Sequence, residues 1–288
     1  MATQVRLTAG SGARDGHRRD LPLLESAESE IVVDARALGP SHPMFLVRLG
    51  VFVNWYRLRG HEVTILEPED GRMAQDLDGL DSAEAARGEE GQLRLSREGS
   101  VALRKIESDL DIENVASEAI EVLEGQAPEL ALWGDALHTA IGELCDNATY
   151  HGKSELGAYV AANRISEPQP MFRLAISDLG IGIPEHIRGH YPDWQDDNAA
   201  IAKALEEGVS GSGRPDRGYG LTEVLDKALA ASLVRASSVA AIDIRSARGR
   251  VVESLVQGQR RAAQAPTTAR RGTAITYEIT TAGVRSSL

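Results

Sequence analysis

A carboxylate and an amide stand one helical turn apart near the middle of the chain. Glu143, Asn147 and His151 follow one another at i, i+4 and i+8, so in a helix they share one stripe. A carboxylate can take a proton from an attacking water or hydroxyl group. An amide oxygen can bind a hard cation such as Mg²⁺. The same spacing is common on solvated helix faces, so the stripe alone leaves both interpretations open.

A second carboxylate is expected to point inward at the end of a strand over residues 171–177. Three apolar residues alternate along that strand: Phe172, Leu174 and Ile176. Asp178 shares their parity and should therefore face the core, where a buried carboxylate needs hydrogen-bond donors. The exocyclic amine of adenine is one suitable donor, and Gly180 and Gly182 would let a planar ligand approach closely. The alternative is that Asp178 caps a helix starting at Pro184.

A glycine-rich run spans residues 208–220 and ends as Gly218-Tyr219-Gly220-Leu221, directly before a predicted helix over 222–231. Free amides at a helix N-terminus form a site suited to phosphate. The run is not a Walker motif, because no Lys-Ser/Thr follows its last glycine, and no strand leads into it as in a Rossmann fingerprint. Thr273, after Gly272, shares parity with the apolar residues of a last strand over 273–279, although a strand Thr often reflects β-propensity alone.

The hydrophobic pattern predicts the elements that must position these residues. Leu137, Ile141, Leu144 and Ala148 form an apolar stripe on one helix over 131–151, which Gly152 closes. Further expected elements are a helix at 110–123, a strand at 240–245 and a long Arg- and Ala-rich loop at 246–271. The basic cluster Arg260, Arg261, Arg270 and Arg271 is expected to be solvated rather than an anion contact.

Four short motifs in this order resemble the nucleotide boxes of the ATPase superfamily that includes gyrase B, Hsp90, histidine kinases and MutL. They are Glu-Leu-Cys-Asp-Asn-Ala at 143–148, Asp-Leu-Gly-Ile-Gly-Ile at 178–183, Gly-Tyr-Gly-Leu at 218–221 and Gly-Thr at 272–273. The resemblance covers about residues 115–285. It implies an α/β (α+β) fold of the Bergerat type, a two-layer sandwich with a mixed sheet on one side and helices on the other.

The same resemblance implies ATP and Mg²⁺ as ligands. Asn147 would bind the Mg²⁺, and Glu143 would be the general base for water or for an acceptor hydroxyl. Asp178 would bind the adenine amine and Thr273 would support adenine. The remaining motif residues would shape the pocket or touch the phosphates beneath a lid at about 190–217: Gly180, Gly182, Ile183, Gly218, Tyr219, Gly220 and Leu221.

The N-terminal part predicts a β–α–β unit with parallel strands. Strands are expected at 30–34 and 63–66, with a helix over 44–59 between them. Residues 32–66 resemble a STAS-like domain, the fold of anti-anti-sigma factors. Those factors carry a phosphorylated Ser at the start of the helix, where this chain has His42-Pro43-Met44, with Ser41 nearby. We therefore expect a docking or structural role for this unit.

The predicted organisation is a flexible segment at 1–29 with one strand near Val5, a STAS-like domain with a linker at 30–100, and an ATP-binding domain at 101–288. The net charge of −12 argues against nucleic acid as a partner. Cys145, the one cysteine, is expected to be a core residue. The first 20 residues lack a signal-peptide pattern and no long apolar run occurs, so a cytosolic protein without membrane contact is expected.

Three functions remain open at this level. The first is a regulatory switch that hydrolyses ATP slowly or phosphorylates a Ser of a protein partner, as anti-sigma kinases do. The second is an atypical histidine kinase, for which the candidate acceptors His42, His61 and His138 lie in unsuitable sequence contexts. The third is an ATP-gated interaction module without chemistry. The partner would be a sigma or anti-sigma type regulator bound through the N-terminal unit, and a homodimer is left open.

Overall fold

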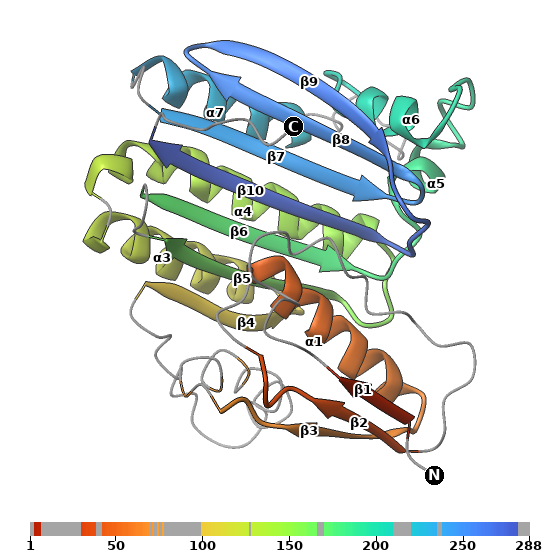
Figure 1. Cartoon of the computed structure of the whole chain (residues 1–288). Coiled ribbons are helices and arrows are strands. Elements are labelled where there is room, and N and C mark those ends of the chain that lie inside the picture. Colours follow the sequence, from red (N-terminus) through yellow and green to blue (C-terminus); the bar gives the residue numbers. More distant parts are fainter. Residues whose placement is uncertain are drawn as a thin grey trace.

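The computed structural model describes residues 3–6, 30–38, 42–69, 71, 74, 77, 99–126, 128–165, 170–209, 220–234 and 238–281 (Figure 1). The strands are β1 Thr3–Arg6, β2 Glu30–Asp34, β3 Glu62–Leu66, β4 Ser100–Ile106, β5 Ala158–Ile165, β6 Met171–Asp178, β7 Ser238–Ser246, β8 Gly249–Val256, β9 Gln259–Pro266 and β10 Thr273–Thr281. The helices are α1 Pro43–Leu58, α3 Asp109–Gln126, η1 Pro128–Trp133, α4 Gly134–Asp146, η2 Asn147–His151, α5 Ile183–Ile187, α6 Asp197–Ala204 and α7 Gly220–Val234.

Seven strands form one large sheet in the order β4-β5-β6-β10-β7-β8-β9, and every neighbouring pair is antiparallel. The fold is α+β as expected, but the mixed sheet is a wrong prediction for this part. Sequential strands β5–β6, β7–β8 and β8–β9 pair directly, which reverses the chain each time. Between β4 and β5 the two helices α3 and α4 return the chain to the same end of the sheet. The strands β6 and β7 point in the same direction, but β10 lies between them and is antiparallel to both.

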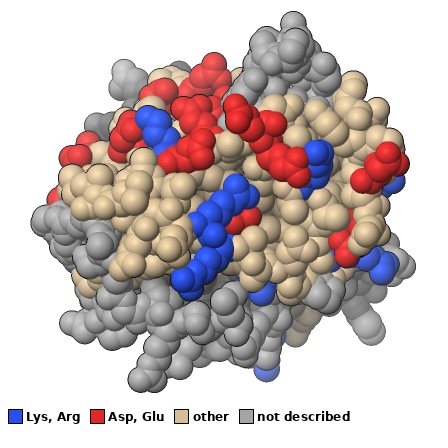
Figure 2. All heavy atoms as spheres, turned by 90° about the horizontal axis from the view of Figure 1, so that it is seen from above, with Lys and Arg blue, Asp and Glu red and all other residues tan. Residues whose placement is uncertain are grey.

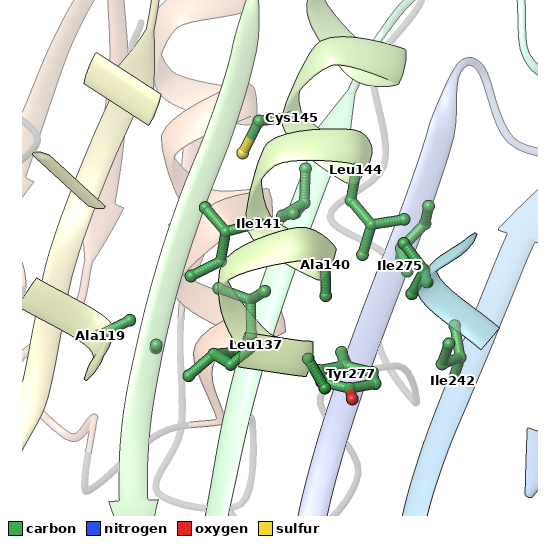
Figure 3. Close-up of a cluster of buried hydrophobic side chains, with 14 of the residues drawn as sticks. Ala119, Leu137, Ala140, Ile141, Leu144, Cys145, Ile242, Ile275 and Tyr277 are labelled. Atoms are coloured by element: carbon green, nitrogen blue, oxygen red, sulfur yellow. The ribbon is translucent and has the colours of Figure 1, made fainter. Parts of the chain in front are cut away.

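One face of the large sheet is covered by α3, α4 and α7 (Figure 1). The expected apolar stripe of α4 is buried there, and Figure 3 shows Leu137, Ile141 and Leu144 directed towards residues of the sheet such as Ile275. Cys145 is fully buried in the same cluster, and burial raises the pKa of its thiol to about 12. Its expected role as a core residue is therefore confirmed.

The opposite face is covered by α1, which lies between the large sheet and a small parallel sheet of order β1-β2-β3. The predicted strand near Val5 and the parallel β–α–β unit are both confirmed. Nearly every residue of α1 from Pro43 to Val53 is buried, as in a helix enclosed on all sides. Its core includes Leu103, Tyr159 and Ala175 of the large sheet.

The N-terminal unit thus adds a third layer to the predicted two-layer sandwich. Its apolar core continues across residue 100, where the sequence predicts a boundary between two domains. The boundary itself stays a prediction, and residues 78–98 of the expected linker lie outside the described residues. The packing shows that α1 shares an apolar core with the large sheet.

The structure differs from the sequence-based expectations at three places. The expected loop at 246–271 contains β8 and β9, joined by a turn at Gln257 and Gly258 with positive φ. The strand β5 was not predicted because Ala158 to Ala162 are buried on both faces and show no alternation. The single helix predicted over 131–151 divides into the 3₁₀ turn η1, the α-helix α4 and the π-turn η2.

Within the described parts of the chain, no helix combines the length and the apolar character that crossing a membrane would require.

Candidate functional site

The stripe of Glu143, Asn147 and His151 lines one cavity of about 250 Å³. The first residue belongs to α4, and the other two belong to η2, where the Gly152 N–H donates to the Asn147 carbonyl across a wider turn. Such π-turns recur at functional sites because they change the direction of side chains within a helix. The predicted stripe therefore faces the cavity rather than open solvent.

Asp178 ends β6 and lies at the floor of the same cavity, with 2% of its surface exposed. The apolar residues that share its parity, Phe172, Leu174 and Ile176, pack on the helix side of the sheet, so the predicted inward direction is confirmed. Burial raises the pKa of its carboxyl group to about 7, against the lowering effect of backbone N–H groups. One of these is the Gly180 N–H, which donates to Oδ1 over 2.6 Å.

The turn after Asp178 depends on its glycines. Gly180 packs directly on the backbone of Gly152, and a Cβ atom there would collide with the Gly152 carbonyl. Gly182 has a φ of +78° and begins α5. The Ile181 N–H donates to the Gly152 carbonyl over 2.8 Å, so the turn is fastened to the end of η2. Gly182 and Ile183 line the cavity, whereas Gly180 supports it from behind.

Thr273 lies at the start of β10 and lines the cavity, as its parity predicts. Its hydroxyl is 3.1 Å from the hydroxyl of Ser246, a fully buried residue at the end of β7. The Ser246 Oγ also accepts from the Ile183 N–H over 2.8 Å. Ser246 therefore joins β7, β10 and the start of α5. No pattern in the sequence indicates this role, because residue 246 is predicted to begin a loop.

The helix α7 begins at Gly220, and this end faces the carboxylate of Glu143. A Cβ atom at Gly220 would collide with Oε2 of Glu143 and lie 3.7 Å from Nδ2 of Asn147. Gly220 and Leu221 line the cavity. Gly218 and Tyr219 lie outside the described residues, as does the lid from residue 210 onward. The part of the expected lid that is described includes α6, which packs on β8.

Two imidazole rings form part of the cavity wall. His151 of η2 and His186 of α5 have ring centroids 5.0 Å apart. Burial and the neighbouring His151 lower the pKa of His186, so the neutral ring is favoured there. His186 was not predicted, because its place in the wall depends on the packing of α5 against η2.

The described lining of the cavity carries acidic side chains without basic ones. The described lining residues include the acidic side chains of Glu143, Asp178 and Glu223 but no Lys or Arg. No group of three or more His, Cys, Asp or Glu side chains that could hold a metal ion occurs among the described residues. A metal held here would therefore take part of its coordination from a bound ligand or water, as Mg²⁺ commonly does.

The candidate phosphoacceptor His42 is enclosed in the fold. It caps α1, and its Nδ1 accepts from the Met44 N–H over 3.1 Å. Its Nε2 lies 3.6 Å from Glu278 of β10, and the side chain is 5% exposed. An imidazole ring buried in this way cannot enter the nucleotide-binding site of another molecule to receive a phosphoryl group. Ser41 lies outside the described residues.

No family model and no curated protein matches the sequence. One similar solved structure is the crystal structure of the 43K ATPase domain of Thermus thermophilus gyrase B in complex with an aminocoumarin. It is 15% identical to this chain, with a TM-score of 0.26, and the alignment covers 56% of this chain. This chain spans 40% of the length of that structure. A similarity of this size adds nothing to the assignment, which rests on the residues of the site.

Proposed function

We propose that this protein binds an adenine nucleotide with Mg²⁺ in the cavity between α4, α5, α7 and the large sheet. The observation that carries the proposal is the carboxylate of Asp178, buried at the cavity floor among glycines that leave room for a flat ring. A carboxylate in such a place is costly unless it meets donors. The exocyclic amine of adenine supplies one, and the four motifs that resemble nucleotide boxes meet at this cavity as far as they are described.

The other end of the cavity suits phosphates. The helix α7 starts there, and its first N–H groups are directed out of the helix end, where they favour anions. Asn147 offers an amide oxygen to a hard cation, and the acidic lining makes such a cation necessary for a polyphosphate. When bound, Mg²⁺ would neutralise phosphate charge and polarise the phosphoryl group.

Glu143 is the residue we assign to general base catalysis. Its carboxylate lies beside Gly220 at the phosphate end, and not beside Asp178 at the floor. From there it would accept a proton from a water molecule or from a hydroxyl group of a partner protein. This position favours a nucleotide-hydrolysing or phosphate-transferring switch over a module that only senses ATP. In this proposal the partner is a regulatory protein. The described part of the fold does not identify which one.

The test is calorimetric titration of the full chain with ATP and ADP, each with and without Mg²⁺. We expect saturable binding that weakens when Mg²⁺ is removed. The Glu143→Gln variant should bind ATP as wild type does and lose turnover, because the amide keeps the shape of the side chain but cannot take the proton. Absence of nucleotide binding would refute the proposal, and unchanged turnover in Glu143→Gln would refute the role of that residue.

Transfer and hydrolysis are separated by a second assay. ATP labelled at the γ-phosphate is incubated with the protein and with candidate STAS-domain proteins as acceptors. Label on a partner Ser that depends on Glu143 would indicate a kinase, and release of inorganic phosphate alone would indicate an ATPase. Binding without either product would favour the ATP-gated interaction module.

A further inference from the structure

The peptide group between Leu179 and Gly180 is held from both of its sides. Its N–H, on Gly180, donates to the Asp178 carboxylate over 2.6 Å. Its carbonyl, on Leu179, accepts from Nε of Arg271 over 3.0 Å. The orientation of this peptide plane therefore helps to set where the Asp178 carboxylate points, together with the other backbone N–H groups that reach it, among them that of Thr273.

Arg271 is itself positioned by α1. Its guanidinium lies over the indole ring of Trp55, 4.8 Å from the ring centroid. Arg59, directly after the end of α1, lies over the same indole at 3.0 Å and makes no contact with Leu179 that the structure records. Stacking of a guanidinium on an indole is attractive and restricts the direction of its N–H groups.

We propose that Arg271 and Trp55 are positioning residues for the nucleobase end of the cavity, and that through them the N-terminal unit acts on nucleotide binding. The chain of contacts runs from the Trp55 indole through the Arg271 guanidinium and the Leu179–Gly180 peptide to the Asp178 carboxylate. A charged donor on the carbonyl strengthens donation by the N–H of the same peptide, because hydrogen bonds in series polarise one another. The proposal rests on the proposed function of the cavity.

Besides the backbone N–H groups of the turn and of Thr273, the titratable side chains near Asp178 offer no hydrogen bond to the Leu179 carbonyl that the described structure records. Facing the cavity are Glu143 from α4, His151 from η2, His186 from α5 and Glu223 from α7. None of these lies on the side of the sheet occupied by Trp55 and α1. Arg271 is the described cation whose donor reaches the turn between Asp178 and Gly182.

The first half of the test needs no nucleotide. Labelling the full chain with carbonyl ¹³C on Leu and ¹⁵N on Gly restricts a carbonyl-edited amide spectrum to Leu–Gly pairs. The sequence contains only the pairs ending at Gly39, Gly50, Gly157 and Gly180. We expect Arg271→Ala to move the Gly180 amide signal upfield, because its hydrogen bond to Asp178 loosens. Arg59→Ala, which removes the other cation from the same indole, should leave that signal in place.

The second half measures ADP affinity for the same variants by calorimetry. Arg271→Ala should weaken binding by about three- to tenfold, the effect of one lost charged hydrogen bond on an exposed support. Trp55→Leu should weaken it in the same direction, and Arg59→Ala should not. Thermal melts identify any variant that fails to fold, and Arg271→Lys then serves as a second substitution that keeps the charge but loses the planar fork.

The outcomes separate the two proposals. An unmoved Gly180 signal in Arg271→Ala, or an equal loss of affinity in Arg59→Ala, would overturn the positioning role. A moved signal without nucleotide binding by wild type would keep the link between Arg271 and Asp178 and refute the proposed function. A moved signal with unchanged ADP affinity would show that the N-terminal unit does not act on the site.

Discussion

At the scale of single residues, the carboxylate of Asp178 is in a position that costs stability in the absence of a ligand. The pKa of its carboxyl group is about 7 in the folded protein, against 3.8 for an ordinary Asp side chain. The Asp178 carboxyl group therefore binds its proton more tightly in the folded state than in the unfolded chain. The stability that this group contributes is fully present below about pH 4 and is lost as the pH rises through about 7.

The Asp178→Asn variant tests this cost. Without nucleotide, we expect it to unfold with a free energy about 2–4 kcal/mol above that of wild type at pH 8, because one pKa unit corresponds to about 1.4 kcal/mol. The difference should be smaller at pH 5, where wild type is largely protonated at this site. Chemical denaturation at the two pH values measures it, and a difference that does not depend on pH would contradict the account.

Gly220 offers a second prediction about a single residue. A methyl group there would meet the Glu143 carboxylate, so Gly220→Ala should displace that side chain and reduce ATP turnover at least tenfold. Gly142→Ala is the matched control, because its Cβ would meet nothing within 4 Å and it also lies in a helix. Both variants should keep or slightly raise the melting temperature, since Ala favours helix over Gly. Equal turnover in the two variants would show that Glu143 takes no part in the reaction.

At the scale of elements, Ser246 shows how the end of one strand holds the start of a helix. Replacing it by Ala removes its contacts with Thr273, with the Gly272 carbonyl and with the Ile183 N–H. We expect a loss of about 1–3 kcal/mol in the free energy of unfolding together with weaker nucleotide binding.

Ser238→Ala is the control on the same strand. Ser238 lies at the other end of β7 and accepts from the indole N–H of Trp133 over 3.2 Å. It should lose stability by a comparable amount and keep its nucleotide affinity. Urea denaturation and ADP titration of both variants make the comparison. If Ser238→Ala weakened binding as much as Ser246→Ala, the effect would reflect general stability and not the position of α5.

The elements also show what the sequence could predict. The stripe of Glu143 and Asn147 and the inward direction of Asp178 follow from local periodicity, so the sequence alone predicts them. Ser246 and His186 were missed because their roles depend on contacts between segments far apart in the chain. The strand β5 was missed for a related reason, since burial on both faces removes the alternation that marks a strand.

At the scale of the whole molecule, α1 belongs to an apolar core on one face of the large sheet, and a second core with α3, α4 and α7 lies on the opposite face. Phe52 of α1 is 1% exposed, and its replacement by Ala should lower the free energy of unfolding by about 3–5 kcal/mol. Because α1 packs on β5 and β6, we expect one cooperative transition, seen alike in circular dichroism and in tryptophan fluorescence. Two separate transitions would indicate an autonomous N-terminal domain.

The surface of the whole molecule bears on its ligands. The formal net charge is −12, and acidic side chains are spread over the face seen in Figure 2, with basic side chains between them. Such a surface repels polyanions unless a cation accompanies them. We therefore expect ATP affinity to depend on Mg²⁺ more strongly than on ionic strength.

The most direct test of the central claim is whether Asp178 recognises the exocyclic amine of adenine. Wild type and Asp178→Asn are titrated with ATP and with purine riboside triphosphate, which lacks the exocyclic amine. We predict that wild type prefers ATP by about tenfold or more, because a carboxylate left without its donor is costly, and that Asp178→Asn loses most of this preference. Equal affinity of wild type for the two nucleotides, or an unchanged preference in Asp178→Asn, would contradict the central claim.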